Sequence, residues 1–137
     1  MPVALDTNVL VRLLVRDDEG QYQAARRFLE AAEAAGEDVL VLLGVLLETE
    51  WVLRSRYRLD KPSISATFAR LLESQGVAFE HEATVEETLY IWAQNPGADF
   101  ADCLHSARAV HLGCTRFATF DVAAARLPGG SLLTAAS

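Results

Sequence analysis

Apolar and polar positions along the chain follow two different periods. Short continuous apolar runs are typical of buried strands, whereas apolar residues spaced three and four apart predict helices. The short runs predict strands at 3–6, 39–42, 77–79, 116–120 and 131–133. The helical spacing predicts helices near 8–15, 20–35, 45–57, 61–74, 84–94 and 100–111. Strands that alternate with helices indicate an α/β fold, with a parallel sheet covered on both faces.

The length and composition of the chain indicate one globular domain. A chain of 137 residues with 51% hydrophobic residues can bury one sizeable core and is too short to suggest two domains. Its most apolar stretch, VLVLLGVLL at 39–47, is too short to span a bilayer, and the N-terminus lacks the basic region of a secretory signal. We therefore expect a single domain over residues 1–137, no membrane span and a cytoplasmic location.

The chain has two cysteines, Cys103 and Cys114. Two are too few for a disulfide framework or a four-ligand zinc site, so we expect both to be small buried residues. The three histidines also lack the spacing of a zinc site, although His105 lies three residues from Asp102 and could approach that side chain.

The net charge of −7 speaks against a nucleic-acid partner, because phosphate binding favours basic proteins. The basic residues are almost all arginines, however, and several stand close together in the sequence. Five of them are candidates for a local basic rim that would contact a nucleic acid: Arg12, Arg16, Arg54, Arg56 and Arg108. A solvated helix face is the competing interpretation for each cluster.

Five acidic residues stand where predicted strands end or predicted helices begin. Asp6 ends the first strand, and Asp121 directly follows the fourth. Asp99 and Asp102 share the first turn of one helix, and Glu48 lies in the first half of another. Because the carboxyl ends of parallel strands face one crevice, these acids are scattered in sequence and plausibly gathered in space.

Each of these acids also has a purely structural interpretation, and Glu48 could be an exposed helix residue. Asp6, followed by Thr7-Asn8, could cap the next helix, and Asp99 with Asp102 resembles a capping box. Carboxylates are stabilised at the positive end of a helix, so such positions need no ligand. Asp121 could simply start a turn, and none of these acids is decisive alone.

Spacing helps to separate Glu48 from its neighbour Glu50. Glu50 has Arg54 four residues later, which is the favourable order for a surface ion pair on a helix. Glu48 has Val52 at the same distance and therefore lacks such a partner. This favours Glu48 as the acid that faces a site.

Four segments together resemble the PIN-domain ribonucleases of the VapC toxin type. They are LDTNVL at 5–10, LLETEWVL at 46–53, DFADCLHSA at 99–107 and ATFD at 118–121. The resemblance extends over nearly the whole chain and implies a single PIN domain. It also implies a three-layer α/β/α sandwich with a central parallel sheet of four to five strands.

The resemblance also assigns site residues. The family's metal-binding and catalytic carboxylates fall on Asp6, Glu48, Asp102 and Asp121, and Asp99 matches a further aspartate found in part of the family. Such acids suit Mg²⁺, with Mn²⁺ as an expected substitute, and a bound cation would activate water for RNA hydrolysis with 5′-phosphate and 3′-hydroxyl products. The cation would reverse the local charge and so answer the objection from net charge.

Three polar residues are expected to support these ligands by hydrogen bonds. They are Thr7, Asn8 and Thr119, for which ordinary turn and cap roles are the alternative. The resemblance further implies an RNA substrate, a VapB-like antitoxin and a homodimer. Apolar surface for these contacts is expected from residues 39–47 and around Trp51, although core packing is the main expectation for that segment. A non-catalytic α/β protein-binding module remains the alternative function, and divalent-metal titration would separate the two.

Overall fold

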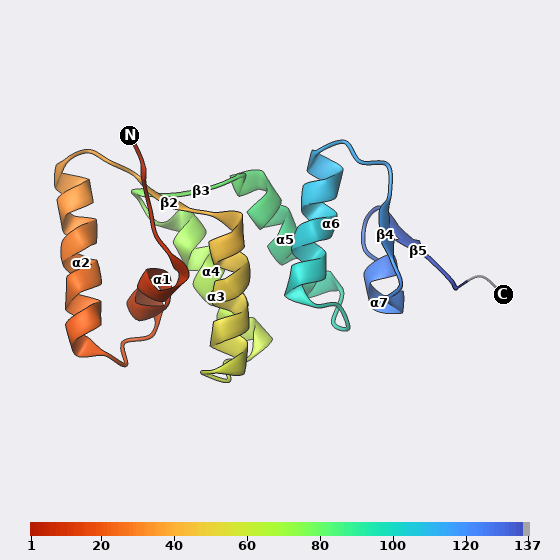
Figure 1. Cartoon of the computed structure of the whole chain (residues 1–137), viewed down its shortest axis with the longest axis horizontal. Helices are drawn as coiled ribbons and strands as arrows, with labels where there is room; N and C mark the ends of the chain where they lie inside the picture. The colour runs from red at the N-terminus through yellow and green to blue at the C-terminus, as the bar shows by residue number, and fades with distance from the viewer. Residues whose placement is uncertain (136–137) are drawn as a thin grey trace. The chain divides into compact units, whose positions relative to one another are not determined.

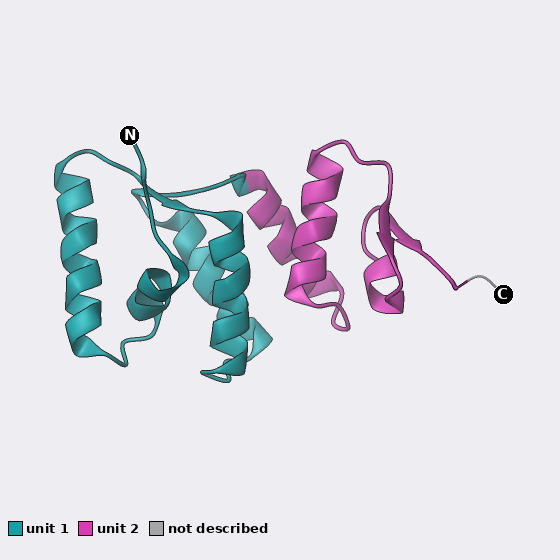
Figure 2. Ribbon diagram, in the orientation of Figure 1, with its two compact units in different colours: residues 1–82 teal, residues 83–137 magenta. Residues whose placement is uncertain are grey.

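The computed structural model describes residues 1–135. The chain forms two compact units, which comprise residues 1–82 (unit 1) and residues from Ala83 onward (unit 2), as Figure 2 shows. This division does not decide whether the chain forms a single domain, so the single domain predicted from its length stays a prediction.

Unit 1 alternates short strands with helices (Figure 1). Its elements are β1 (Val3–Ala4), α1 (Thr7–Leu14), α2 (Glu19–Ala34), β2 (Val39–Val41), α3 (Leu43–Ser55), α4 (Lys61–Glu73) and β3 (Val77–Phe79). The strands form one parallel sheet in the order β1-β2-β3, in which Val39 lies opposite both Val3 and Val77. The carboxyl ends of all three strands therefore lie at one edge of this sheet, where the residues that follow each strand gather.

Local sequence explains where three of the unit 1 helices begin. Asp6, Asp18 and Asp60 are the N-cap residues of α1, α2 and α4, and the side chain of each accepts a hydrogen bond from the backbone N–H three residues later. Such caps satisfy donors that a helix leaves free at its start. The core of unit 1 has fully buried members on β2, α3 and α4, which include Val41, Leu46, Leu53, Ile64 and Phe68.

Unit 2 comprises mainly helices with a small sheet at its C-terminal side. Its elements are α5 (Glu82–Gln94), α6 (Phe100–His111), β4 (Phe117–Thr119), α7 (Val122–Ala125) and β5 (Gly130–Leu132). The rings of Trp92 and Phe100 pack edge to face with centroids 5.0 Å apart. Strands β4 and β5 pair in parallel. The four-residue helix α7 was not predicted, because one turn is too short to show an apolar period.

The predicted α/β alternation and parallel pairing are confirmed, and all five strands lie within a residue or two of their predicted positions. The predicted number of strands in the sheet is wrong for the described residues 1–135. There, backbone pairing gives a three-stranded sheet and a separate two-stranded sheet instead of one sheet of four to five strands. Periodicity identifies a strand but not its neighbour, because pairing depends on contacts between distant parts of the chain.

The surface agrees only in part with the sequence. In segment 39–47, Val39, Val41, Val45 and Leu46 are buried, but Leu42 is 37% exposed, and Trp51 is 57% exposed. Cys103 is buried, but Cys114 is exposed, so the expectation that both are buried is wrong for Cys114. Among residues 1–135, no helix is both long and apolar enough to cross a membrane.

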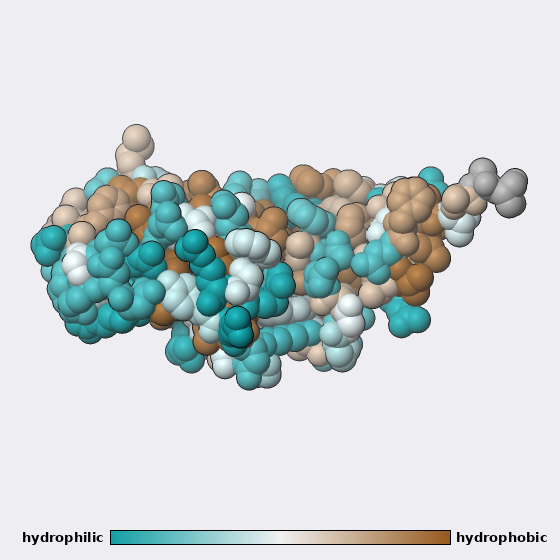
Figure 3. Space-filling view, turned by 60° about the horizontal axis from the view of Figure 1, so that its bottom comes forward, coloured by the Kyte–Doolittle hydropathy of each residue, from teal (hydrophilic) through white to brown (hydrophobic). Residues whose placement is uncertain are grey.

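Unit 2 carries exposed apolar side chains on β5 and around α7. Figure 3 shows apolar surface toward the C-terminal side of this unit, and the exposed residues there include Phe120, Val122, Leu132 and Leu133. These exposed side chains lie outside residues 39–47 and the region around Trp51, where the sequence predicted apolar surface.

Candidate functional site

In unit 1, Asp6 and Glu48 are linked through Thr7. Asp6 is exposed at the N-cap of α1, and its Oδ1 accepts a hydrogen bond from the backbone N–H of Val9 at 3.2 Å. The capping interpretation of Asp6 is therefore confirmed, and it leaves the second carboxylate oxygen available to a cation. The Thr7 hydroxyl, one residue later, donates to Oε1 of Glu48 at 3.3 Å. This bond joins the start of α1 to α3 and brings two of the predicted site acids into one neighbourhood.

Glu48 and Glu50 occupy opposite environments on α3. Glu48 is exposed, whereas the side chain of Glu50 is only 3% exposed and accepts a hydrogen bond from Arg54 Nε at 2.9 Å. The predicted Glu50–Arg54 pair therefore forms, but the expectation that Glu50 lies at the surface is wrong. Residues two apart on a helix point in nearly opposite directions, so one can be buried while the other faces solvent. The exposed carboxylate of Glu48 is the one that a cation from solvent can reach.

A pocket of about 470 Å³ lies beside Asp6 in unit 1. It is formed by β1, α1 and α2, and its polar lining comes from Asp6, Asn8, Arg12 and Gln21. Asp6 therefore faces a hollow large enough for a small ligand. Asn8, predicted to support the site, lines the same hollow.

In unit 2, three further acids stand at helix starts. Asp99 is the N-cap of α6, but its side chain makes no cap hydrogen bond, so the capping-box interpretation is not supported. Asp102 lies in the first turn of the same helix and is half-buried. Asp121 caps α7 by accepting a hydrogen bond from Ala123 N at 2.9 Å. Its own backbone N–H donates to the Thr119 hydroxyl at 3.0 Å, which ties Thr119 to this acid.

The three acids of unit 2 influence one another electrostatically. The pKa of Asp102 is raised, first by burial and then by the negative charges of Asp99 and Asp121. His105, one helical turn away, opposes the shift, so it stands close to Asp102 as the sequence suggested. A carboxylate whose neighbours disfavour its charge gains most from a bound cation, which would reverse the sign of that interaction.

The donor chemistry of these acids fits Mg²⁺, because every candidate ligand is a carboxylate oxygen. The acids occur in two groups, Asp6 with Glu48 in unit 1 and Asp99, Asp102 and Asp121 in unit 2. Within the part of the chain that the structure describes, no three histidine, cysteine, aspartate or glutamate side chains are arranged to hold a metal ion. A site that uses both groups therefore stays a prediction.

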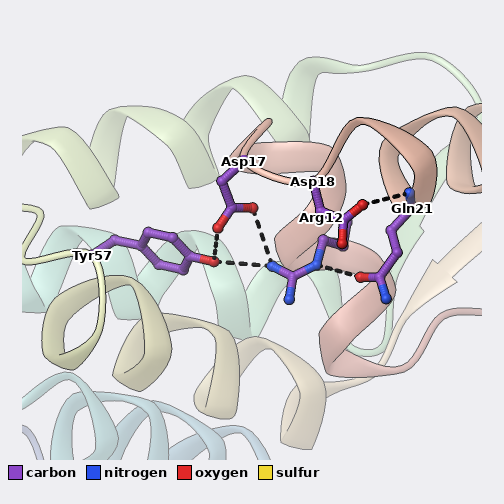
Figure 4. A network of polar contacts seen from close by, with 5 residues as sticks. All are labelled: Arg12, Asp17, Asp18, Gln21 and Tyr57. Carbon is purple, nitrogen blue, oxygen red and sulfur yellow. Dashed lines mark hydrogen bonds and ion pairs between the residues drawn. The ribbon is translucent and has the colours of Figure 1, made fainter.

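Three of the five arginines proposed for an RNA-binding rim are engaged in contacts within unit 1. Figure 4 shows Arg12, which donates from Nε to Gln21 at 2.6 Å and from Nη1 to the Tyr57 hydroxyl at 2.9 Å. The Tyr57 hydroxyl donates to Asp17, which also forms an ion pair with Arg12 at 3.3 Å.

Arg16 and Arg54 are paired as well. Arg16 forms an ion pair with Glu19, and Arg54 forms one with Glu50. The sequence contains both acids at helical spacing, but the Arg12 network depends on Tyr57, which is 45 residues away and carried no sequence signal. These contacts do not exclude contact with RNA, so the rim role stays a prediction for all five arginines.

Comparison with known proteins agrees with the sequence motifs. The profile of the PIN domain family matches residues 3–130, which include all five candidate acids. A VapC ribonuclease from Aquifex aeolicus (strain VF5) is 25% identical over 116 residues, which cover 85% of this chain and 84% of the relative. The match to the family extends over both compact units, and the chain therefore belongs to the PIN domain family.

Proposed function

We propose that this protein is a Mg²⁺-dependent endoribonuclease that serves as the toxin of a VapBC-type toxin–antitoxin module. The observation that carries the proposal is the group of acids at the starts of α6 and α7, where half-burial and then the charges of Asp99 and Asp121 raise the pKa of Asp102. Such repulsion is unfavourable in the free protein and is relieved by a cation. The PIN family match and the similarity to a VapC ribonuclease support the same activity.

The ligands that we propose are Asp6, Glu48, Asp102 and Asp121, with Asp99 as an additional acid of unit 2. When bound, Mg²⁺ would supply an activated water and charge stabilisation for hydrolysis of a phosphodiester, and Mn²⁺ would substitute. The chain contributes the oxygen ligands and their hydrogen bonds. Thr7 orients Glu48 and Thr119 holds the backbone of Asp121, which are the contacts that fix ligand direction at metal sites.

The partners that we propose are RNA and a VapB-like antitoxin. An acidic cluster without its cation attracts a guanidinium, so we expect the antitoxin to insert an arginine toward Asp6, Glu48 and Asp121. Arg12, Arg16 and Arg54 form ion pairs within the chain, and a bound cation would add a further attraction for RNA phosphate. A homodimer is proposed from the family resemblance.

Product analysis tests the proposed chemistry directly. The purified protein should cleave RNA in Mg²⁺ or Mn²⁺, lose activity in EDTA, and leave 5′-phosphate and 3′-hydroxyl ends, because water rather than the 2′-hydroxyl is the nucleophile. A 2′-deoxy nucleotide before the cleaved bond should therefore preserve cleavage. Products with a 2′,3′-cyclic phosphate would contradict the mechanism, and titration calorimetry without any Mn²⁺ binding at millimolar concentration would favour the non-catalytic binding module.

A further inference from the structure

Helix α3, which carries Glu48, begins differently from the other helices of unit 1. Its N-cap residue is Leu42, whose side chain cannot accept a hydrogen bond. In α1, α2 and α4 an aspartate performs that role from the N-cap position itself. The first N–H groups of α3 therefore have no acceptor on their own N-cap side chain.

Glu80 supplies this acceptor from the end of β3. Its Oε1 accepts a hydrogen bond from the backbone N–H of Leu43 at 2.8 Å, across 37 residues of sequence, and the bond is partly buried. The backbone N–H of Glu80 also donates to the carbonyl of Val41, the last residue of β2, at 2.9 Å. Glu80 is thus held at both ends, and it ties the edge of the sheet to the first turn of α3.

A carboxylate is well suited to this position. It accepts an N–H that would otherwise lack a helical partner, and its negative charge interacts favourably with the positive end of the helix. Glu48 lies five residues after Leu43, about 7.5 Å along the helix axis, so the start of α3 and the site acid are rigidly related. Thr7 then connects Glu48 to the segment that begins with Asp6.

We infer that Glu80 is a positioning residue that, by capping α3 from the end of β3, sets the place of Glu48 relative to Asp6 and so the affinity of these acids for a divalent cation. This inference rests on the proposed metal-dependent function. Glu80 acts through the helix and is not proposed as a ligand.

Asp60 provides a matched control, because it caps α4 through a similar bond, from Ser63 N to its carboxylate at 2.9 Å, and α4 carries none of the candidate acids. Mn²⁺ affinity of the purified full chain, measured by titration calorimetry without RNA, is the main readout. Melting temperature in EDTA is the second. The variants are Glu80→Ala, Glu80→Gln and Asp60→Ala, with Glu48→Gln as the reference for loss of a ligand.

In EDTA, Glu80→Ala and Asp60→Ala should lower the melting temperature by similar amounts, about 3–5 °C, because each removes one helix cap. Only Glu80→Ala should weaken Mn²⁺ binding, by about 5–10-fold, as expected when support for a metal ligand is lost. Glu80→Gln should recover most of the affinity, since its amide oxygen still accepts the bond. In a Glu48→Gln background, Glu80→Ala should cause little further loss.

Equal Mn²⁺ affinity of Glu80→Ala and Asp60→Ala would overturn the inference while leaving the proposed function intact. Failure of the unmodified protein to bind Mn²⁺ would instead contradict the proposed function itself. If Glu80→Ala does not fold, Glu80→Asp makes the same comparison, because it keeps the charge but is one methylene too short for the bond. Unchanged affinity in Glu80→Asp would also overturn the inference.

Discussion

Asp6 and Glu48 in unit 1 are held differently from Asp102 in unit 2. In unit 1, Asp6 accepts a backbone N–H and Glu48 accepts a hydroxyl, so each carboxylate has a donor. In unit 2, Asp121 also accepts a backbone N–H, but Asp102 is half-buried, and burial and then the charges of Asp99 and Asp121 raise its pKa. Acids that the sequence assigns to one metal site can therefore differ in how much their ionised form destabilises the metal-free protein. Asp6 and Glu48 each have a hydrogen-bond donor without a cation, whereas Asp102 would gain from a bound cation.

The largest expected effect is on RNA cleavage, and it should be the same for acids of both units. Asp6→Asn and Asp102→Asn should each lower the RNA cleavage rate by about 100-fold or more, because loss of even an outer partner of a metal site costs roughly 10–100-fold. Cleavage of a labelled RNA in millimolar Mg²⁺ measures both variants. Circular dichroism of each variant serves as the control for folding. An active Asp6→Asn protein would mean that the helix cap is the whole role of Asp6.

Stability without metal should separate the two acids. In EDTA at pH 7, Asp102→Asn should melt at a higher temperature than the unmodified protein, because it removes a charge that burial and two acids disfavour. Asp6→Asn should change the free energy of unfolding by less than about 0.5 kcal/mol, since Asn caps a helix as well as Asp, whereas Asp6→Ala should cost about 1 kcal/mol. Urea unfolding of the three variants measures these differences.

The gain in stability from Asp102→Asn should be present at neutral pH and disappear at acidic pH. The pKa of Asp102 is raised in the folded chain, so its ionisation costs stability once the pH exceeds the unfolded pKa near 4, and the cost is complete above the folded pKa. Below about pH 3 the group is protonated in both states, and the advantage should vanish. A stabilisation that stays constant from pH 3 to pH 7 would show that lost repulsion is not its cause.

Glu19 offers the smallest and sharpest test, because it is an acid surrounded by donors. Hydrogen bonds from Arg16 and then Gln23 lower its pKa to about 2. Its contribution to stability should therefore be present above the ordinary pKa of Glu and be lost as the pH falls toward 2. Carboxyl chemical shifts followed by NMR should give a midpoint near 2, and Arg16→Gln should raise it. If Arg16→Gln leaves the titration midpoint of Glu19 unchanged, hydrogen bonds from Arg16 do not lower the pKa of Glu19, and the contrast between a donor-surrounded Glu19 and an acid-surrounded Asp102 is lost.

The sequence predicted features that depend on local chemistry and missed those that depend on distant contacts. The strands, six helices and the cap at Asp6 follow from periodicity and from the preference of carboxylates for helix starts. The division into two sheets and the bond from Glu80 to Leu43 join residues far apart in the chain, and no local spacing encodes them. The burial of Glu50 beside an exposed Glu48 was missed for the same reason, because burial is decided by what packs against the helix.

The hydrogen bond that Asp6 accepts from Val9 has a consequence for how the protein would depend on its ion supply. Under the proposed function, the first turn of α1 is complete before any ion arrives, so removing the ion would stop the reaction without melting this scaffold. The ion would then be an exchangeable catalytic ion rather than a structural metal ion. An enzyme of this kind can be switched off by chelation and restored by adding Mg²⁺ back, with no refolding step between the two states.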